Sequence, residues 1–223
     1  MRWTRSGNDS GARTPSTRAE RSPYAEGVTG TRFARAIEAI DAANADDPNR
    51  LVVRGVQRPK ELAHAELVTE WLQKLDPDAS EALLLAGRAH HIKRWTIPRS
   101  SYPEGRSGYL RWRRALHEVH ADEVGRILAD VGYDSAVVDR VRDLVRKRGL
   151  GRDPDAQAIE DALCLVFIET QLLDLAARLD HDKVVDVVAK TMRKMSDRGI
   201  ELAGTIDLPA PAKELLTESA ARR

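Results

Sequence analysis

The sequence predicts an all-α fold, an irregular or orthogonal bundle of seven or eight helices. Apolar residues recur at the 3.6-residue spacing of an amphipathic helix along most of the chain, as in Phe33, Ile37 and Ile40. Helix-capping and helix-breaking residues separate these stretches. No internal repeat or heptad register is evident, which favours an irregular bundle over a coiled coil or a solenoid.

The N-terminal half contains three helix signals. The first helix begins near Phe33 and ends at NADDPN, residues 44–49. LVVRGV, residues 51–56, fits a short strand without an obvious partner, so a loop or minor hairpin is expected there. Pro59 suits the first position of the next helix, which runs to Leu75. Ser80 can cap a third helix, EALLLAGRAHHIKRW.

A long loop, TIPRSSYPEGRSG (96–108), then leads into the C-terminal half. Loops of this length inside a compact domain are usually functional. Caps at Asp134 or Ser135 and at Asp153 divide the following helices. The expected helices are Tyr109–Val131, 135–147, one starting after Asp153 and running through DAQAIEDALCLVFIETQLLDLAARL, Asp182–Met195 and one near the C-terminus.

The chain divides into three expected regions. Residues 1–29 are rich in Ser, Thr, Gly and Arg and poor in aliphatic side chains, which predicts a disordered basic leader. Residues 30–205 form the helical domain, and residues 206–223 a C-terminal helix or tail. The 223 residues are enough to bury a substantial core in one domain.

Composition excludes several classes of protein. The formal net charge of +1 gives no global attraction to nucleic acid, so basic character must be local. Cys164 is the single cysteine, which rules out an internal disulfide and fits a reducing compartment. No apolar run approaches the roughly 20 residues of a membrane span. We therefore expect a cytoplasmic protein without a membrane partner.

Histidines on apolar helix faces are the strongest functional signal. His64, His90, His91 and His120 each continue the apolar side of their helix, and Asp161 lies on a helix that is apolar nearly all round. A buried carboxylate is costly unless it is paired, hydrogen-bonded or bound to a cation. Imidazoles and carboxylates from different helices suit a divalent metal. Hydrogen-bonded core histidines and a structural ion pair of Asp161 are the alternatives.

Three stretches resemble the HD superfamily of metal-dependent phosphohydrolases. LLLAGRAHHIKR resembles the motif in which a His-Asp pair ends an apolar helix, and HADEVGRILADVGYDSAVVDRVRDLV resembles the helix pair that follows. DAQAIEDALCLVFIE resembles the helix with the last metal-binding aspartate. The resemblance implies an HD-like fold and a divalent ion of Mn, Fe, Ni, Zn or Mg. The ligands that it implies are His64, His90, His91, His120 and Asp161.

A closer resemblance is to an uncharacterised family, the domain of unknown function 4202, over about Phe33 to Leu202. Its specific phrases here are KRWTIPRSSYPEGRSGYLRWRRAL, QAIEDALCLVFIE and KTMRKMS. His91 stands where an HD protein has aspartate, so one usual carboxylate is replaced. This resemblance weights His91, His120, Glu160 and Asp161 above His64 and His90. Glu160 is the candidate general base or supporting carboxylate, and with Asp161 forms the expected catalytic pair.

A basic, aromatic stretch follows the histidine pair, from Lys93 to Arg114. Arginine forks suit phosphate oxygens, and aromatic faces can stack a base. Surface ion pairs and helix packing are the alternative interpretation. The expected phosphate- or substrate-binding residues are Arg94, Trp95, Arg99, Tyr102 and Arg113.

Three functions follow from these patterns. The first is a metal-dependent phosphohydrolase or phosphodiesterase that acts on a nucleotide, a cyclic phosphate or an RNA end. The second is a non-catalytic module that binds a nucleotide or RNA on an HD-like scaffold. The third is a protein-interaction scaffold with no small-molecule site.

Overall fold

The computed structural model describes residues 30–223, and the expected leader of residues 1–29 lies outside this part of the chain. The all-α prediction is confirmed: a two-stranded hairpin is the one sheet among the described residues. The described helices number nine, one or two more than expected. They are α1 (Arg32–Ala45), α2 (Lys60–Leu75), α3 (Glu81–Ala89), α4 (Gly105–Val131), α5 (Ser135–Val145), α6 (Pro154–Ala176), α7 (His181–Met192), α8 (Asp197–Ala203) and α9 (Ala210–Ala221).

The hairpin consists of β1 (Arg50–Val53) and β2 (Val56–Pro59), paired antiparallel with Val53 opposite Val56. Arg54 and Gly55 form its two-residue turn with φ angles of 50° and 80°, the left-handed backbone that such tight turns need. The strand that the sequence left without a partner, β1, therefore pairs with β2 across the turn that LVVRGV itself contains.

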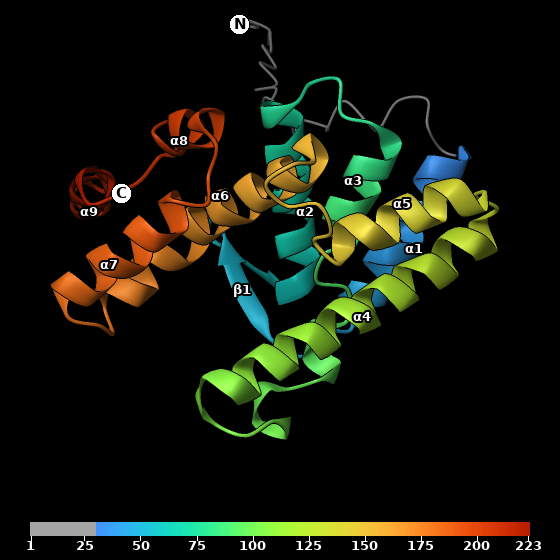
Figure 1. Ribbon diagram of the computed structural model, residues 1–223, viewed down its shortest axis with the longest axis horizontal. Helices are drawn as coiled ribbons and strands as arrows, with labels where there is room; N and C mark the ends of the chain where they lie inside the picture. Colours follow the sequence, from blue (N-terminus) through green and yellow to red (C-terminus); the bar gives the residue numbers. More distant parts are fainter. Residues whose placement is uncertain (1–29) are drawn as a thin grey trace, which may run out of the picture.

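Helix α2 runs through the middle of the molecule, with α1, α3, α6 and the hairpin against it (Figure 1). Helices α4 and α5 lie side by side at one end, and α7 packs with α9 at the other. Helix α6 is buried around most of its circumference, as its continuous apolar sequence predicts. Its Leu165, Ile168 and Leu172 are fully buried in the core.

The chain departs from the expected helices at three places. Helix α3 ends at Ala89, so His91 lies in a turn and not within a helix. A short 3-10 helix, Arg94–Thr96, ends at the first residue of the expected loop of residues 96–108, a second, Arg99–Ser101, lies within it, and α4 already begins at Gly105. Helix α8 is additional, and Ser196 caps it by accepting a hydrogen bond from the Gly199 amide.

No helix in the described part of the chain is long and apolar enough to cross a membrane.

The thiol of Cys164 is buried on α6, where it faces the Thr191 carbonyl. Burial, and then the nearby Glu160 carboxylate, raise the pKa of this thiol to about 12. Because the thiolate is the reactive form, we expect almost no reaction with a thiol reagent at pH 8 in the folded protein. One thiol should react rapidly after unfolding in denaturant. Rapid labelling of the native protein would contradict the burial of this residue.

Candidate functional site

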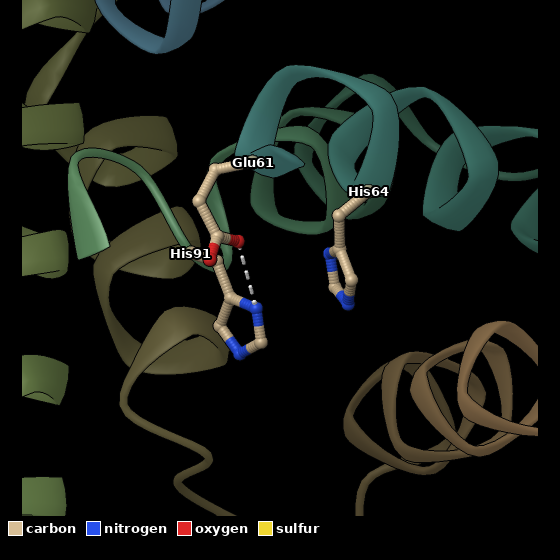
Figure 2. A group of neighbouring side chains, drawn as sticks. All are labelled: Glu61, His64 and His91. Carbon is tan, nitrogen blue, oxygen red and sulfur yellow. Dashed lines mark ion pairs between the residues drawn. The ribbon is translucent and has the colours of Figure 1, made fainter. Parts of the chain in front are cut away.

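Glu61, His64 and His91 form a group, here called the Glu–His–His group, whose potential ligand atoms all lie within 4.8 Å of one another. Glu61 and His64 project from α2 one turn apart, and His91 approaches from the turn after α3 (Figure 2). The Glu61 Oε2 and His91 Nδ1 atoms are 3.3 Å apart. Two separate segments therefore supply three donors to one place.

Asp47 positions Glu61. Pro59, at the N-terminal end of α2, has no side chain that can cap the helix. The buried Asp47 carboxylate supplies the missing acceptor, since its Oδ2 accepts a 2.9 Å hydrogen bond from the Glu61 amide. Its Oδ1 accepts from the Asn49 amide and side chain. The end of α1 thus fixes the first turn of α2.

The turn that carries His91 is fixed by the same part of α1. Lys93 has a φ of 52°, a left-handed conformation that turns the chain sharply after α3. The Lys93 amide donates a 3.0 Å hydrogen bond to Oδ1 of Asn44, a buried residue near the end of α1. Both sides of the Glu–His–His group are therefore held by α1 and the residues just after it.

Further imidazoles surround the group. The His64 and His91 rings stack with centroids 4.5 Å apart, and His90 lies 5.1 Å from His91. Two histidines one turn apart on α4 complete a histidine cluster: His120 is 6.2 Å from His91, and His117 is 6.4 Å from His90. The cluster consists of His64, His90, His91, His117 and His120.

Burial keeps these imidazoles neutral. It lowers the pKa of both His64 and His120 to about 3, and the cationic Arg94 nearby adds to the effect. The pKa of His91 is likewise lowered by burial, and then by His64 and Arg94. A neutral imidazole keeps the lone pair that binds a metal ion. The cluster is therefore ready to donate electron pairs at neutral pH.

The Glu61 carboxylate is buried without adequate compensation. Burial raises its pKa to about 7, although the positive charge of Arg94 opposes the shift. Within the described chain its Oε2 has no hydrogen-bond partner, and the same holds for Nδ1 of His90 and both ring nitrogens of His120. Buried polar atoms without partners are costly. A cation would satisfy the carboxylate, and imidazole with carboxylate is a donor set that suits borderline divalent metals.

Access to the group is from the side of His91. The His91 side chain is 24% exposed, whereas that of Glu61 is 5% exposed. His64, His90 and His120 are buried. The group is therefore enclosed by protein on the side of His64 and Glu61 and reaches solvent through His91.

Comparison with known proteins gives one match. A family described as Domain of unknown function (DUF4202) matches residues 34–216. The chain belongs to this family. No curated protein and no solved structure matches the chain. The match to DUF4202 includes the Glu–His–His group and the whole histidine cluster.

Asp161, expected as a ligand, lies outside the Glu–His–His group. Its Oδ1 accepts hydrogen bonds from the Ser196 amide and from Gln157 Nε2, each 2.9 Å long, and its Oδ2 accepts from the Ser196 hydroxyl. Ser196 in turn caps α8. The Asp161 carboxylate therefore joins α6 to the start of α8.

Glu160, expected as a general base, is paired with a lysine. Burial works to raise its pKa, but the charge and hydrogen bond of Lys147 outweigh burial, so the pKa is lowered. Lys194 lies 3.9 Å from the other carboxylate oxygen. A carboxylate held in its charged form by two lysines is a poor proton acceptor at neutral pH.

The expected phosphate-binding residues have different surroundings. The Arg94 guanidinium lies 4.7 Å from the centre of the Trp112 ring, and its charge acts on Glu61, His64, His91 and His120. Arg99 donates to the carbonyls of Tyr102 and Pro103, which folds its own loop. Trp95, Tyr102 and Arg113 are half-buried. Of these residues, Arg94 interacts most directly with the Glu–His–His group.

Sequence reasoning missed Glu61 and His117. Glu61 precedes His64 by three residues and His117 precedes His120 by three, so each shares a helix face with a histidine that was identified. A Glu-x-x-His spacing on one helix is a known way of directing two ligands to one point. That spacing was the available signal.

We predict that Asp161→Ala lowers the free energy of unfolding by about 1–3 kcal/mol, because it leaves the Ser196 amide and hydroxyl without their acceptor. Urea denaturation would measure the change. Asp174→Ala is the matched control, since Asp174 is on the same helix with its side chain 74% exposed. Equal stability of the two variants would contradict a structural role for Asp161.

Proposed function

We propose that this protein is a metal-dependent phosphohydrolase or phosphodiesterase whose ion is bound by Glu61, His64 and His91. The observation that carries the proposal is the convergence of a buried carboxylate that lacks a donor with two neutral imidazoles. The partly exposed His91 leaves one direction open for a reactant. Of Mn, Fe, Ni, Zn and Mg, a donor set of two imidazoles and one carboxylate favours Fe, Ni and Zn over Mn and Mg.

The surrounding residues fit reactions of phosphate esters. A bound divalent ion lowers the pKa of a water molecule and offsets charge on a phosphoryl oxygen. Arg94 adds a fixed positive charge beside the group, held against Trp112. A preorganised cation of this kind stabilises the negative charge that develops when a phosphate ester is attacked. The predicted HD-like relationship supports the same chemistry and stays a prediction.

His90 and His120 are placed to support the ligands. Both are buried within the histidine cluster, and both have ring nitrogens without a partner in the described chain. Their ring centroids lie 5.1 and 6.2 Å from that of His91. We assign them an orienting role, because oriented imidazoles lose less entropy when an ion is bound.

We expect the purified wild-type protein to bind about one divalent ion per chain, and Glu61→Gln to weaken the affinity about tenfold or more. Glutamine keeps the shape of the side chain and removes its charge. Elemental analysis gives the stoichiometry, and competition with a chromophoric chelator gives the affinity. His181→Asn is the matched control, since His181 is exposed and paired with Glu218 far along the chain.

The control must bind the ion as the wild type does. If Glu61→Gln and the wild type bind metal equally well, the assignment of the group is wrong. If the wild type binds none after both aerobic and anaerobic preparation, the proposed function is wrong.

Catalytic activity distinguishes this function from the second candidate, a non-catalytic module that binds a nucleotide or RNA. The arginine-lined surface along α4 favours that second candidate as well. We expect the metal-loaded protein to hydrolyse p-nitrophenyl phosphate or its bis-ester, and His91→Asn to lower kcat about tenfold or more. Release of p-nitrophenol measures the rate. If the protein binds the ion but hydrolyses neither ester with any of the five metals, the result would favour the non-catalytic binding module.

A further inference from the structure

A groove of about 420 Å³ lies along α4, beside the end of α5. Its volume is within the range of sites that hold small organic ligands. Arginines dominate its walls, and a histidine of the cluster is part of its lining. The lining residues are Leu110, Arg113, Arg114, His117, Arg146 and Arg148, together with one acidic residue, Glu118.

Two of the four arginines have no partner that neutralises them. Arg146 pairs with Glu118 at 2.7 Å, and Arg148 pairs with Asp143 at 2.7 Å. Within the described chain, neither Arg113 nor Arg114 forms an ion pair with a carboxylate. Two guanidinium groups that line one groove and form no ion pair are suited to bind a phosphate through charge-assisted hydrogen bonds.

Apolar surface continues from these arginines. Tyr109 and Leu110 precede Arg113 and Arg114 by one turn and are 43% and 51% exposed. The Arg113 guanidinium lies 5.9 Å from the centre of the Tyr109 ring. Exposed aromatic and aliphatic side chains next to free cations suit a ligand with a phosphate at one end and a flat ring at the other.

One residue, His117, belongs both to the lining of the groove and to the histidine cluster. His117 lines the groove, its ring is 6.4 Å from that of His90, and His90 is 5.1 Å from His91. Lys147, between the two lining arginines of the α5 end, has a φ of 57° and points inward to Glu160. That backbone conformation lets Arg146 and Arg148 face the groove while the lysine between them faces the interior.

We propose that the groove binds a mononucleotide, with its phosphate on Arg113 and Arg114 and its base against Leu110 and the exposed Tyr109 ring, which lies beside Arg113 just outside the lining. Hydrolysis of the bound nucleotide would depend on the proposed function, because the mononucleotide is then the phosphate ester on which the Glu–His–His group acts. Binding itself depends on the arginines and not on a metal ion. The two proposals can therefore fail separately.

The test is the affinity for AMP of protein kept in excess EDTA, measured by isothermal titration calorimetry. We expect AMP to bind, more weakly as salt rises, and Arg113→Ala/Arg114→Ala to weaken binding about tenfold or more. Arg114→Ala alone should show a smaller loss in the same direction. Arg111→Ala is the matched control, because Arg111 is exposed on the same helix and does not line the groove.

Ribose 5-phosphate should bind more weakly than AMP, and adenosine more weakly still. Equal loss in Arg111→Ala and the double variant would overturn the proposal, since charge alone would then explain binding. Equal affinity for ribose 5-phosphate and AMP would overturn the nucleotide assignment, as would binding of single-stranded RNA without binding of AMP. Glu61→Gln should bind AMP like the wild type, so loss of metal and loss of nucleotide are distinguishable.

Discussion

The Glu61 carboxylate is removed from water at the start of α2, and its Oε2 makes no hydrogen bond in the described chain, although His91 Nδ1 lies 3.3 Å away. Its nearest polar neighbours are imidazoles that burial keeps neutral, so they contribute lone pairs and no positive charge. Arg94 offsets only part of the cost of burial, and the pKa of Glu61 rises to about 7. A proton or a bound cation would relieve the remaining cost of burying this carboxylate. The way the helices bury Glu61 is thus the physical basis for the metal binding that we propose.

Helix α1 sets the geometry of the site without contributing a ligand to it. Asp47, just beyond its end, holds the Glu61 amide, and Asn44 holds the Lys93 amide after His91. On the same helix, Asp41 forms a two-point ion pair with Arg88 of α3. The polar face of α1 thus fixes the relative positions of α2 and α3. Substitutions in α1 should consequently disturb metal binding although they remove no donor.

Most helices could be predicted because the core repeats at the helical period, but the site could be predicted only in part. Placing His64, His90, His91 and His120 on apolar faces brought out residues that the structure places together. The sequence also predicted that the Asp161 carboxylate is buried and needs a partner. That partner is Ser196, which caps α8, a helix that the sequence did not predict. The spacing of Glu61 and His64 signalled a shared helix face, but not the burial of Glu61, which depends on tertiary packing around the start of α2, where Asp47, fourteen residues earlier, accepts from the Glu61 amide.

The most direct test of the Glu–His–His group is anomalous X-ray diffraction from crystals of the full chain grown with Mn²⁺ or Zn²⁺. Data collected on both sides of the metal's absorption edge identify the element and its place. We predict one anomalous peak bounded by the side chains of Glu61, His64 and His91. The assignment would be contradicted by an anomalous peak elsewhere in the chain with none at these three residues. It would also be contradicted by the absence of any peak.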